Sequence, residues 1–244
     1  MPITAERGYI IPAIGDVYVE CAQRLAQSIR EFHPDANIKI MTANDLPHGD
    51  QGGYANDWQA WYVSPYRQTI KLEADMLVTS PIDHWWTLFE NRDVVISQGC
   101  RDFYDQPGKS RYYRRLIDEN HLPDVYNAIT YWRASKTAQE FWNLVRNIFS
   151  HWDEYKTLLK FPDEVASTDV VYAMAAEIMG RETVTLPQGL GPSIVHMKRY
   201  IVPTRQSDWT KELVWEWDGK HLRINTVAQW GCFHYNVKDW NPNE

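Results

Sequence analysis

Residues 70–78 read IKLEADMLV, a stretch in which two acidic residues, one position apart, separate two apolar runs. The run before Glu73 predicts a buried strand. Because side chains alternate along an extended chain, Glu73 and Asp75 are expected to point the same way. Two carboxylates on one side of a strand end can hold Mg²⁺ or Mn²⁺, which take oxygen ligands and share them with substrate phosphates. Such triplets at strand ends also commonly just face water, so the surrounding pattern has to decide between the two interpretations.

The chain on both sides of this triplet predicts alternating strands and helices. A strand at 8–12, an amphipathic helix that Asp16 caps and a strand at 38–41 form a βαβ unit, which implies a parallel, right-handed crossover. Other expected elements are a short helix at 57–63, a helix at 82–91 that starts at Ser80-Pro81, strands at 93–97 and 125–132, helices capped by Ser135 and Thr168, and a hairpin at 214–224 with an Asp218-Gly219 turn. We expect one α/β domain over residues 1–205, with a β-rich extension over 206–244 packed on it as a single compact unit.

Composition narrows the class of protein. The net charge of −7 argues against binding nucleic acid chiefly through overall charge, although it leaves room for a local basic groove. The three cysteines lie far apart and form no Cys-x-x-Cys, so reduced thiols in a cytoplasmic protein fit best. No signal-peptide core and no run near the roughly 20 apolar residues of a membrane span occurs, so a cytoplasmic protein without a membrane partner is expected. The 12 Trp and 14 Tyr predict either core packing or stacking on sugars and bases.

The order strand, helix, strand and paired acids, followed by residues 76–78 and 81–83, resembles the nucleotide-sugar glycosyltransferases of the GT-A fold. The resemblance is closest to their glycogenin and galactosyltransferase type, family eight, and covers roughly the first four-fifths of the chain. It implies a Rossmann-like, mostly parallel central sheet flanked by helices. It also implies a UDP-sugar donor, a Mn²⁺ or Mg²⁺ ion, and transfer of a hexose or pentose to an acceptor hydroxyl with retention of configuration.

The same resemblance assigns residues to the nucleotide. It implies that backbone at Pro12 and Ala13 meets the base, that Tyr18 stacks on uracil, and that Ala74 inside the triplet lines the site. From the residues alone, Tyr18 is equally a helix residue that packs on the sheet.

For the metal, the resemblance implies Glu73 and Asp75 as ligands, with Glu73 in place of the usual first Asp. His196 is expected to complete the metal shell, and Lys198 to neutralise the departing diphosphate. The residues His234, Lys238 and Trp240 form a competing His…Lys…Trp set.

The family also carries a basic residue in the helix before the triplet, where this chain has Asp57 and Gln59. Arg67, Lys71 or Lys198 would then supply the positive charge for the phosphates. Lys71 shares the predicted strand face of the two acids, so a salt bridge with Glu73 or Asp75 is the other interpretation.

Two polar residues are expected at the sugar. Asn127 lies in a strand that resembles the family's Asn-Ala/Ser-Gly segment, with Ile129 in place of the small Gly, and its other role would be to cap a strand end. Asp169 lies in a segment that resembles the one whose Asp contacts the transferred sugar near the reacting carbon. Helix capping is the alternative role for Asp169.

The acceptor is predicted from a wider resemblance to small glycosyltransferases encoded by tailed phages. In that setting the acceptor is a 5-hydroxymethylcytosine in phage DNA, and the protein works in the host cytoplasm. The basic and aromatic run at 109–115 would contact phosphates and stack on bases, or form the solvated face of a helix. Other interpretations are a protein or saccharide acceptor, a metal-dependent nucleotidyltransferase or phosphohydrolase, and a non-catalytic, Trp-rich carbohydrate-binding protein.

Overall fold

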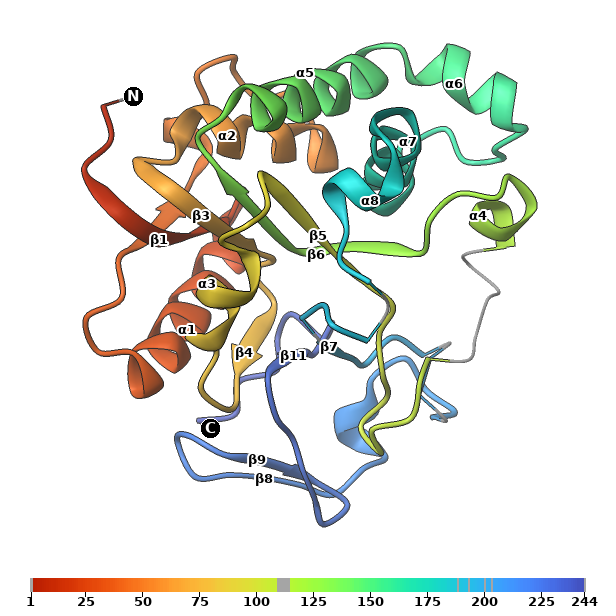
Figure 1. Ribbon diagram of the computed structural model, residues 1–244. Coiled ribbons are helices and arrows are strands. Elements are labelled where there is room, and N and C mark those ends of the chain that lie inside the picture. The colour runs from red at the N-terminus through yellow and green to blue at the C-terminus, as the bar shows by residue number, and fades with distance from the viewer. Residues whose placement is uncertain are drawn as a thin grey trace.

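The computed structural model describes residues 2–108, 115–187, 189–192, 194–199, 201–202 and 204–243, and a five-stranded sheet lies at its centre (Figure 1). Its strands, in spatial order, are β2 (Ile38–Met41), β1 (Ala5–Pro12), β3 (Tyr66–Leu72), β6 (Val125–Arg133) and β5 (Val94–Gln98). β1 runs parallel to β2 and β3, whereas β6 is antiparallel to both of its neighbours. Four of the five strands thus run in one direction and β6 runs against them. In this sense the sheet is mostly parallel, as expected from the sequence.

Helices cover both faces of this sheet because its strands are apolar on both sides. In β1, Tyr9 and Ile11 belong to one buried cluster and Ile10 to another, as alternation along a strand requires. The first cluster contains α1 (Asp16–Phe32) and α3 (His84–Phe89), and the second contains α2 (Ala60–Val63), α5 (Lys136–Ser150) and α7 (Thr168–Met179). Figure 1 shows the two helical layers on opposite sides of the sheet. The remaining described α-helices are α4 (Arg115–Glu119), α6 (Trp152–Leu159) and α8 (Arg181–Val184).

A second, three-stranded sheet joins the C-terminal part of the chain to the segment that follows the acidic triplet. It consists of β4 (Met76–Val78), β11 (Cys232–His234) and β7 (Ile194–His196), with β11 in the middle. β11 is antiparallel to β4 and parallel to β7, and its His234 lies opposite both Met76 and His196. The last strand of the chain therefore ends beside the acids, so the C-terminal part does more than pack on the domain.

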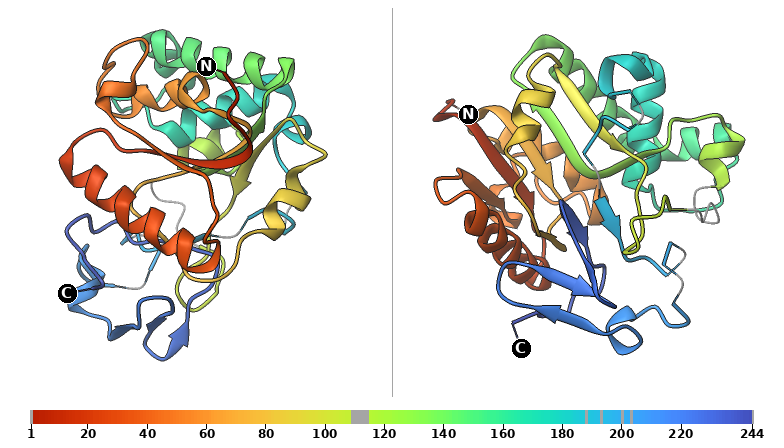
Figure 2. Two further views of the ribbon diagram at one scale, coloured as in Figure 1. Left: turned by 90° about the vertical axis from the view of Figure 1, so that its left-hand side faces the viewer. Right: turned by 60° about the horizontal axis from the view of Figure 1, so that its bottom comes forward.

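The predicted hairpin forms a third sheet at the C-terminal end of the molecule (Figure 2). β8 (Trp215–Trp217) pairs with β9 (Leu222–Ile224), and β10 (Val227–Ala228) adds to β9. Trp209 and Trp240 are buried in the same core as Phe233, so these aromatic residues build the core instead of an exposed tail.

Several expected boundaries differ in the structure. The helix expected from Ser80-Pro81 begins only at His84, with Asp83 as its N-cap. Asp16 is the first helical residue and Gly15 is the N-cap, because the φ of 102° at this position favours glycine. In the same way Thr168 begins α7 and Ser167 is its N-cap. β3 ends at Leu72, so Glu73 and Asp75 lie in the connection to β4 and not on a strand. The division of the chain at residue 205 stays a prediction.

Ser135 provides a test of the helix boundary that the sequence places correctly. Its Oγ accepts a hydrogen bond of 3.2 Å from the Ala138 N–H at the start of α5. We expect Ser135→Ala to lower the free energy of unfolding by about 1 kcal/mol, since one N-terminal N–H loses its partner. Ser150→Ala, at the other end of α5, is the matched control because its hydroxyl donates only to the Arg146 carbonyl. Equal losses for the two variants in urea unfolding would contradict the capping role.

Candidate functional site

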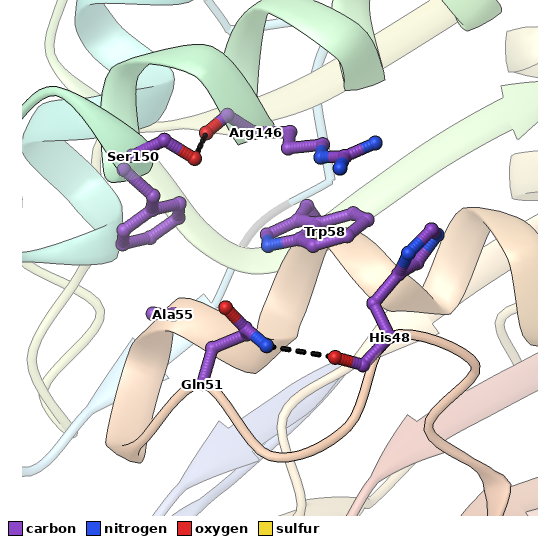
Figure 3. Close-up of a pocket in the computed structure, with 7 residues that line it drawn as sticks. His48, Gln51, Ala55, Trp58, Arg146 and Ser150 are labelled. Carbon is purple, nitrogen blue, oxygen red and sulfur yellow. Dashed lines mark hydrogen bonds between the residues drawn. The ribbon is translucent and has the colours of Figure 1, made fainter.

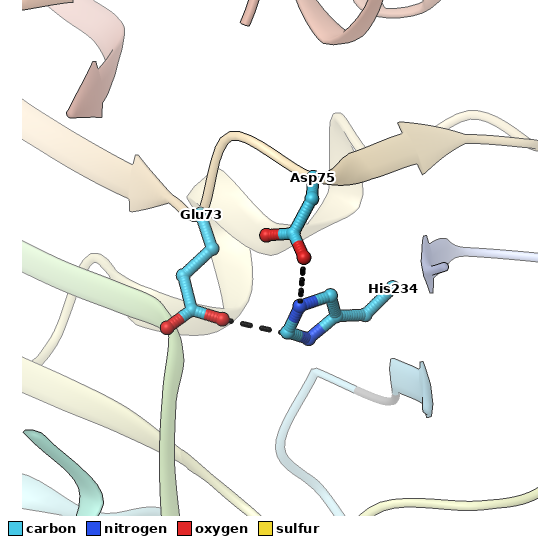
Figure 4. A group of neighbouring side chains, drawn as sticks. All are labelled: Glu73, Asp75 and His234. Atoms are coloured by element: carbon cyan, nitrogen blue, oxygen red, sulfur yellow. Dashed lines mark hydrogen bonds and ion pairs between the residues drawn. The ribbon is translucent and has the colours of Figure 1, made fainter. Parts of the chain in front are cut away.

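The acids of the triplet meet a histidine from the far end of the chain. Glu73, Asp75 and His234 point toward one another (Figure 4), and one ligand atom from each lies within 4.8 Å of the others. Nε2 of His234 lies 2.9 Å from Oδ2 of Asp75, and Nδ1 lies 3.4 Å from Oε2 of Glu73. Asp75 and His234 are buried, whereas 29% of the Glu73 side chain is exposed. The group is thus reached from solvent on the Glu73 side.

The two carboxylates have pKa values shifted in opposite directions. Burial raises the pKa of Glu73, and the negative charges of Asp75 and Asp169 add to the effect. Burial also acts to raise the pKa of Asp75, but His234 and Lys238 outweigh it and lower that pKa well below its usual range. The Lys238 ammonium donates directly to Oδ2 of Asp75. Asp75 therefore stays ionised at neutral pH and attracts positive charge.

The donor set fits a divalent cation. Two carboxylates and an imidazole are ligands that a metal such as Mn²⁺ accepts, and hard cations prefer the oxygen atoms among them. Nδ1 of His234 is buried and has no hydrogen-bond partner among the described residues, while Glu73 faces it. A buried polar atom that makes no hydrogen bond is costly, and a ligated metal ion would satisfy it.

His196, which the sequence favoured as the third ligand, lies on the neighbouring strand. Its ring stacks on that of His234 with centroids 4.4 Å apart, and its Nδ1 lies 3.0 Å from Nδ2 of Asn236. The cluster of Glu73, Asp75 and His234 contains this other histidine, and Lys238 pairs with Asp75, so two residues of the competing set lie next to the acids. Trp240, the third, packs in the core against Trp209 and Phe233. Lys198, half-buried, follows β7 two residues after His196.

Asn127 and Asp169, the two residues expected at the sugar, lie next to the acids. The backbone N–H of Asn127 donates to Oδ1 of Asp169 over 2.8 Å, and its side-chain Nδ2 donates to Oε1 of Glu73 over 3.4 Å. Asp169 sits in the first turn of α7, and Asn127 sits in β6. The structure thus connects both predicted sugar-binding residues to the acid group by hydrogen bonds.

Lys71 has a different place from the one expected. Its neighbours Ile70 and Leu72 face the core under α1, so Lys71 points to the opposite face, where it is fully buried. There it donates to both carboxylate oxygens of Asp57, each at 2.7 Å, and to Oδ1 of Asn127. The salt bridge suggested with Glu73 or Asp75 is made with Asp57. An ammonium has three donors, and all three are used, so none is left for a phosphate.

Arg67 also lies away from the acids. It stands near the start of β3, where its Nε pairs with Glu6 at 3.1 Å. Glu73 comes six residues later, which at about 3.3 Å per residue places it roughly 20 Å away. An arginine side chain does not span that distance, so we exclude Arg67 from the site.

The residues predicted for the nucleotide lie at the end of β1 and the start of α1. Pro12 is the last residue of β1, and the Ala13 N–H donates to the Met41 carbonyl over 2.8 Å. Tyr18, in the first turn of α1, is 37% exposed, and the ammonium of Lys238 lies 5.4 Å from the centre of its ring. Lys238 therefore links Tyr18 to Asp75. Ala74 is buried within the triplet.

The basic and aromatic run at 109–115 falls mostly outside the described residues. Of this run the structure describes Arg115, which begins α4 and pairs with Glu119 at 2.6 Å. Among the described residues no helix is both long and apolar enough to cross a bilayer.

A separate surface hollow of about 280 Å³ lies between α5 and the 3₁₀-helix Gly53–Gln59 (Figure 3). The guanidinium of Arg146 covers the ring of Trp58 there, 4.9 Å from its centre. The other lining residues are His48, Gln51, Ala55, Phe149 and Ser150. The hollow contains none of the residues predicted to bind a donor or a metal.

Solved structures resemble this chain, although no family model matches it and no curated protein matches it in sequence. The apo form of mouse xyloside xylosyltransferase 1 aligns over 97% of this chain and 100% of that chain, with 10% sequence identity and a TM-score of 0.54. This chain has a glycosyltransferase fold. The GT-A fold implied by the sequence is therefore confirmed.

Two further glycosyltransferases align less closely. The galactosyltransferase LgtC, in complex with donor and acceptor sugar analogues, is 14% identical over 94% of this chain and 87% of that chain, with a TM-score of 0.45. A glycosyltransferase involved in glycosylation of the major capsid of PBCV-1 is 12% identical over 94% and 93%, with a TM-score of 0.46.

Proposed function

We propose that this protein is a metal-dependent glycosyltransferase that moves a sugar from a UDP-sugar to an acceptor hydroxyl. The observation that carries the proposal is the convergence of Glu73, Asp75 and His234 at the end of β3, within a glycosyltransferase fold. An anionic diphosphate donor needs positive charge nearby. The two carboxylates and the imidazole can bind a divalent cation, and Lys238 adds a second positive charge next to Asp75.

Each residue around the group then has a definite task. Glu73, Asp75 and His234 hold Mn²⁺ or Mg²⁺, which when bound stabilises negative charge on the leaving diphosphate. Lys238 pairs with Asp75, and in the proposal it contacts a donor phosphate once Asp75 binds the metal. Burial would lower the pKa of Lys238, but Asp75 outweighs it and raises that pKa, so Lys238 carries its charge at neutral pH.

The sugar and the base have their own contacts in the proposal. Asn127 and Asp169 present polar groups to the transferred sugar, next to Glu73. The exposed ring of Tyr18 stacks on the uracil. Holding donor and acceptor together in the reactive geometry supplies a large part of the rate. Retention of configuration follows from the sequence resemblance.

The acceptor in the proposal rests on sequence alone. A 5-hydroxymethylcytosine in DNA is the first acceptor to test. The basic and aromatic run at 109–115 supports this choice, because such residues can contact phosphates. An enzyme that acts on a base within a duplex has to extrude it from the stack. A saccharide or protein hydroxyl is the alternative acceptor of the same enzyme.

Calorimetry with the full chain tests the donor and the metal together. UDP-glucose, UDP-galactose, UDP-arabinose and UDP are titrated with Mn²⁺ and again with EDTA, and slow release of free sugar is followed in parallel. We expect one UDP-sugar to bind in Mn²⁺ and to lose its binding in EDTA. If no UDP compound binds in either condition, the proposed function is wrong.

Tyr18→Ala tests the placement of the base. Loss of one base–aromatic stack is worth about 1–3 kcal/mol, so we expect UDP to bind about 5- to 150-fold more weakly. Pyrophosphate, which has no base, should bind with unchanged affinity. Tyr104→Ala is the matched control, because Tyr104 is similarly exposed at 46% and lies outside the proposed site. Unchanged UDP affinity in the Tyr18 variant would place the base elsewhere.

A further inference from the structure

Lys71 is a fully buried cation in an apolar layer. Trp142 and Tyr172 belong to that layer, and the ammonium lies 5.2 Å from the centre of the Tyr172 ring. A charge is tolerated in such surroundings only when it is paired and hydrogen-bonded. Asp57, which binds the ammonium through both oxygens and also accepts a hydrogen bond from the Tyr172 hydroxyl, is that partner.

The remaining ammonium donor of Lys71 determines how Asn127 lies. A lysine donates and never accepts, so the side chain of Asn127 has to present Oδ1 to it. The amide is planar, and its Nδ2 is therefore turned away from Lys71, toward Oε1 of Glu73 at 3.4 Å. In the flipped orientation two oxygen acceptors, Oδ1 of Asn127 and Oε1 of Glu73, would face each other without a proton between them.

We propose that Lys71 is a positioning residue, which fixes the amide of Asn127 and through it the carboxylate of Glu73. The inference rests on the proposed function and deepens it, since Glu73 is one of the three residues, with Asp75 and His234, that are proposed to hold the metal. The backbone N–H of Asn127 also donates to Asp169, so Asn127 touches both the metal side and the sugar side of the site.

Stability alone does not explain the pair. Replacing a buried ion pair by well-packed hydrophobic residues of similar volume is often neutral or stabilising, because desolvation offsets the attraction between the charges. An uncharged pair, however, has no donor that selects the orientation of the Asn127 amide. Function and stability are thus expected to separate in a variant that removes both charges at once.

The experiment compares Lys71→Met with the double variant Lys71→Met/Asp57→Asn. The single variant leaves Asp57 without its cation and is expected to unfold more easily. The double variant should regain the stability of the wild type, yet bind Mn²⁺ and turn over donor about 10- to 100-fold less well, as for other groups that orient metal ligands. Its crystal structure should show the Asn127 amide turned or displaced.

A matched pair elsewhere provides the control. Lys39 and Asp45 form an ion pair of 2.6 Å at β2, outside the site, and Lys39→Met/Asp45→Asn removes the same two charges. We expect Mn²⁺ affinity, measured by electron paramagnetic resonance, to stay unchanged in this control.

Two outcomes would overturn the inference. One is a double variant at Lys71 and Asp57 with wild-type Mn²⁺ affinity, and the other is a crystal structure in which Asn127 and Glu73 keep their positions. If the wild type itself binds neither Mn²⁺ nor a UDP-sugar, the proposed function fails. The crystal structure of the double variant then still decides whether Lys71 orients Asn127.

Discussion

Trp142→Ala is expected to lower the free energy of unfolding by about 3–5 kcal/mol, the range for truncating a large buried aromatic side chain. Trp142 lies on α5 and is fully buried. It makes edge-to-face contacts with Trp132 of β6 and Tyr172 of α7, at centroid distances of 4.8 and 5.9 Å. Truncation therefore leaves a cavity where the sheet and two helices meet. Urea unfolding of the purified variant measures the loss.

An exposed tryptophan gives the control for this prediction. Trp230 is 47% exposed, and the guanidinium of Arg101 lies 3.7 Å from its ring centre. Trp230→Ala removes one cation–π contact, so a loss of at most about 1 kcal/mol is expected. A similar loss in both variants would show that α5 does not depend on Trp142 for its packing.

Much of the fold is predictable from periodicity because long elements carry their own signal. The apolar spacing of the first helix predicts its buried face, and Ala22, Leu25 and Ile29 are fully buried there. The strand at 38–41 has the predicted bounds. β11, by contrast, is three residues long and pairs with β4 more than 150 residues earlier in the chain. Neither its length nor its partner leaves a local pattern.

The site shows the same division between local and distant information. The acidic triplet is visible in the sequence, and so is the sequence alternation that turns Lys71 away from Ile70 and Leu72. Which histidine meets the acids depends on the order of two neighbouring strands, β7 and β11, whose His196 and His234 lie in register. Each histidine is followed by a lysine, so composition favours neither. β11, and not β7, pairs with β4, and this long-range contact brings His234 next to the acids.

Asp57 was visible in the sequence as a departure from the family pattern, since an acid stands where a basic residue is expected. The structure explains this acid, because Asp57 pairs with the buried ammonium of Lys71. In the proposal the positive charge lies on the strand and orients Asn127, whereas the resembled family carries it on the helix and directs it at the phosphates. Lys238 is then the cation next to the acids.

Asp75→Asn is expected to abolish measurable Mn²⁺-dependent donor binding and to lower turnover about 10²- to 10³-fold, the scale for removing one electrostatic stabiliser of a transition state. Asp75 is the acid that touches both His234 and Lys238, and its lowered pKa keeps it charged. The amide is isosteric but neutral, so it neither attracts the cation nor balances the lysine. Calorimetry with Mn²⁺ and the UDP-sugar that the wild type binds measures the effect.

A second carboxylate–histidine pair makes a matched control for this variant. Asp218 and His221 lie 3.1 Å apart in the exposed turn of the hairpin, far from the acids in the chain. Asp218→Asn removes the same charge beside a histidine and is expected to bind donor as the wild type does. Urea unfolding of both variants separates lost binding from lost structure. If a folded Asp75→Asn protein still bound the UDP-sugar in Mn²⁺ with wild-type affinity, the acid–histidine group would not be the metal site, since its most buried carboxylate would be dispensable.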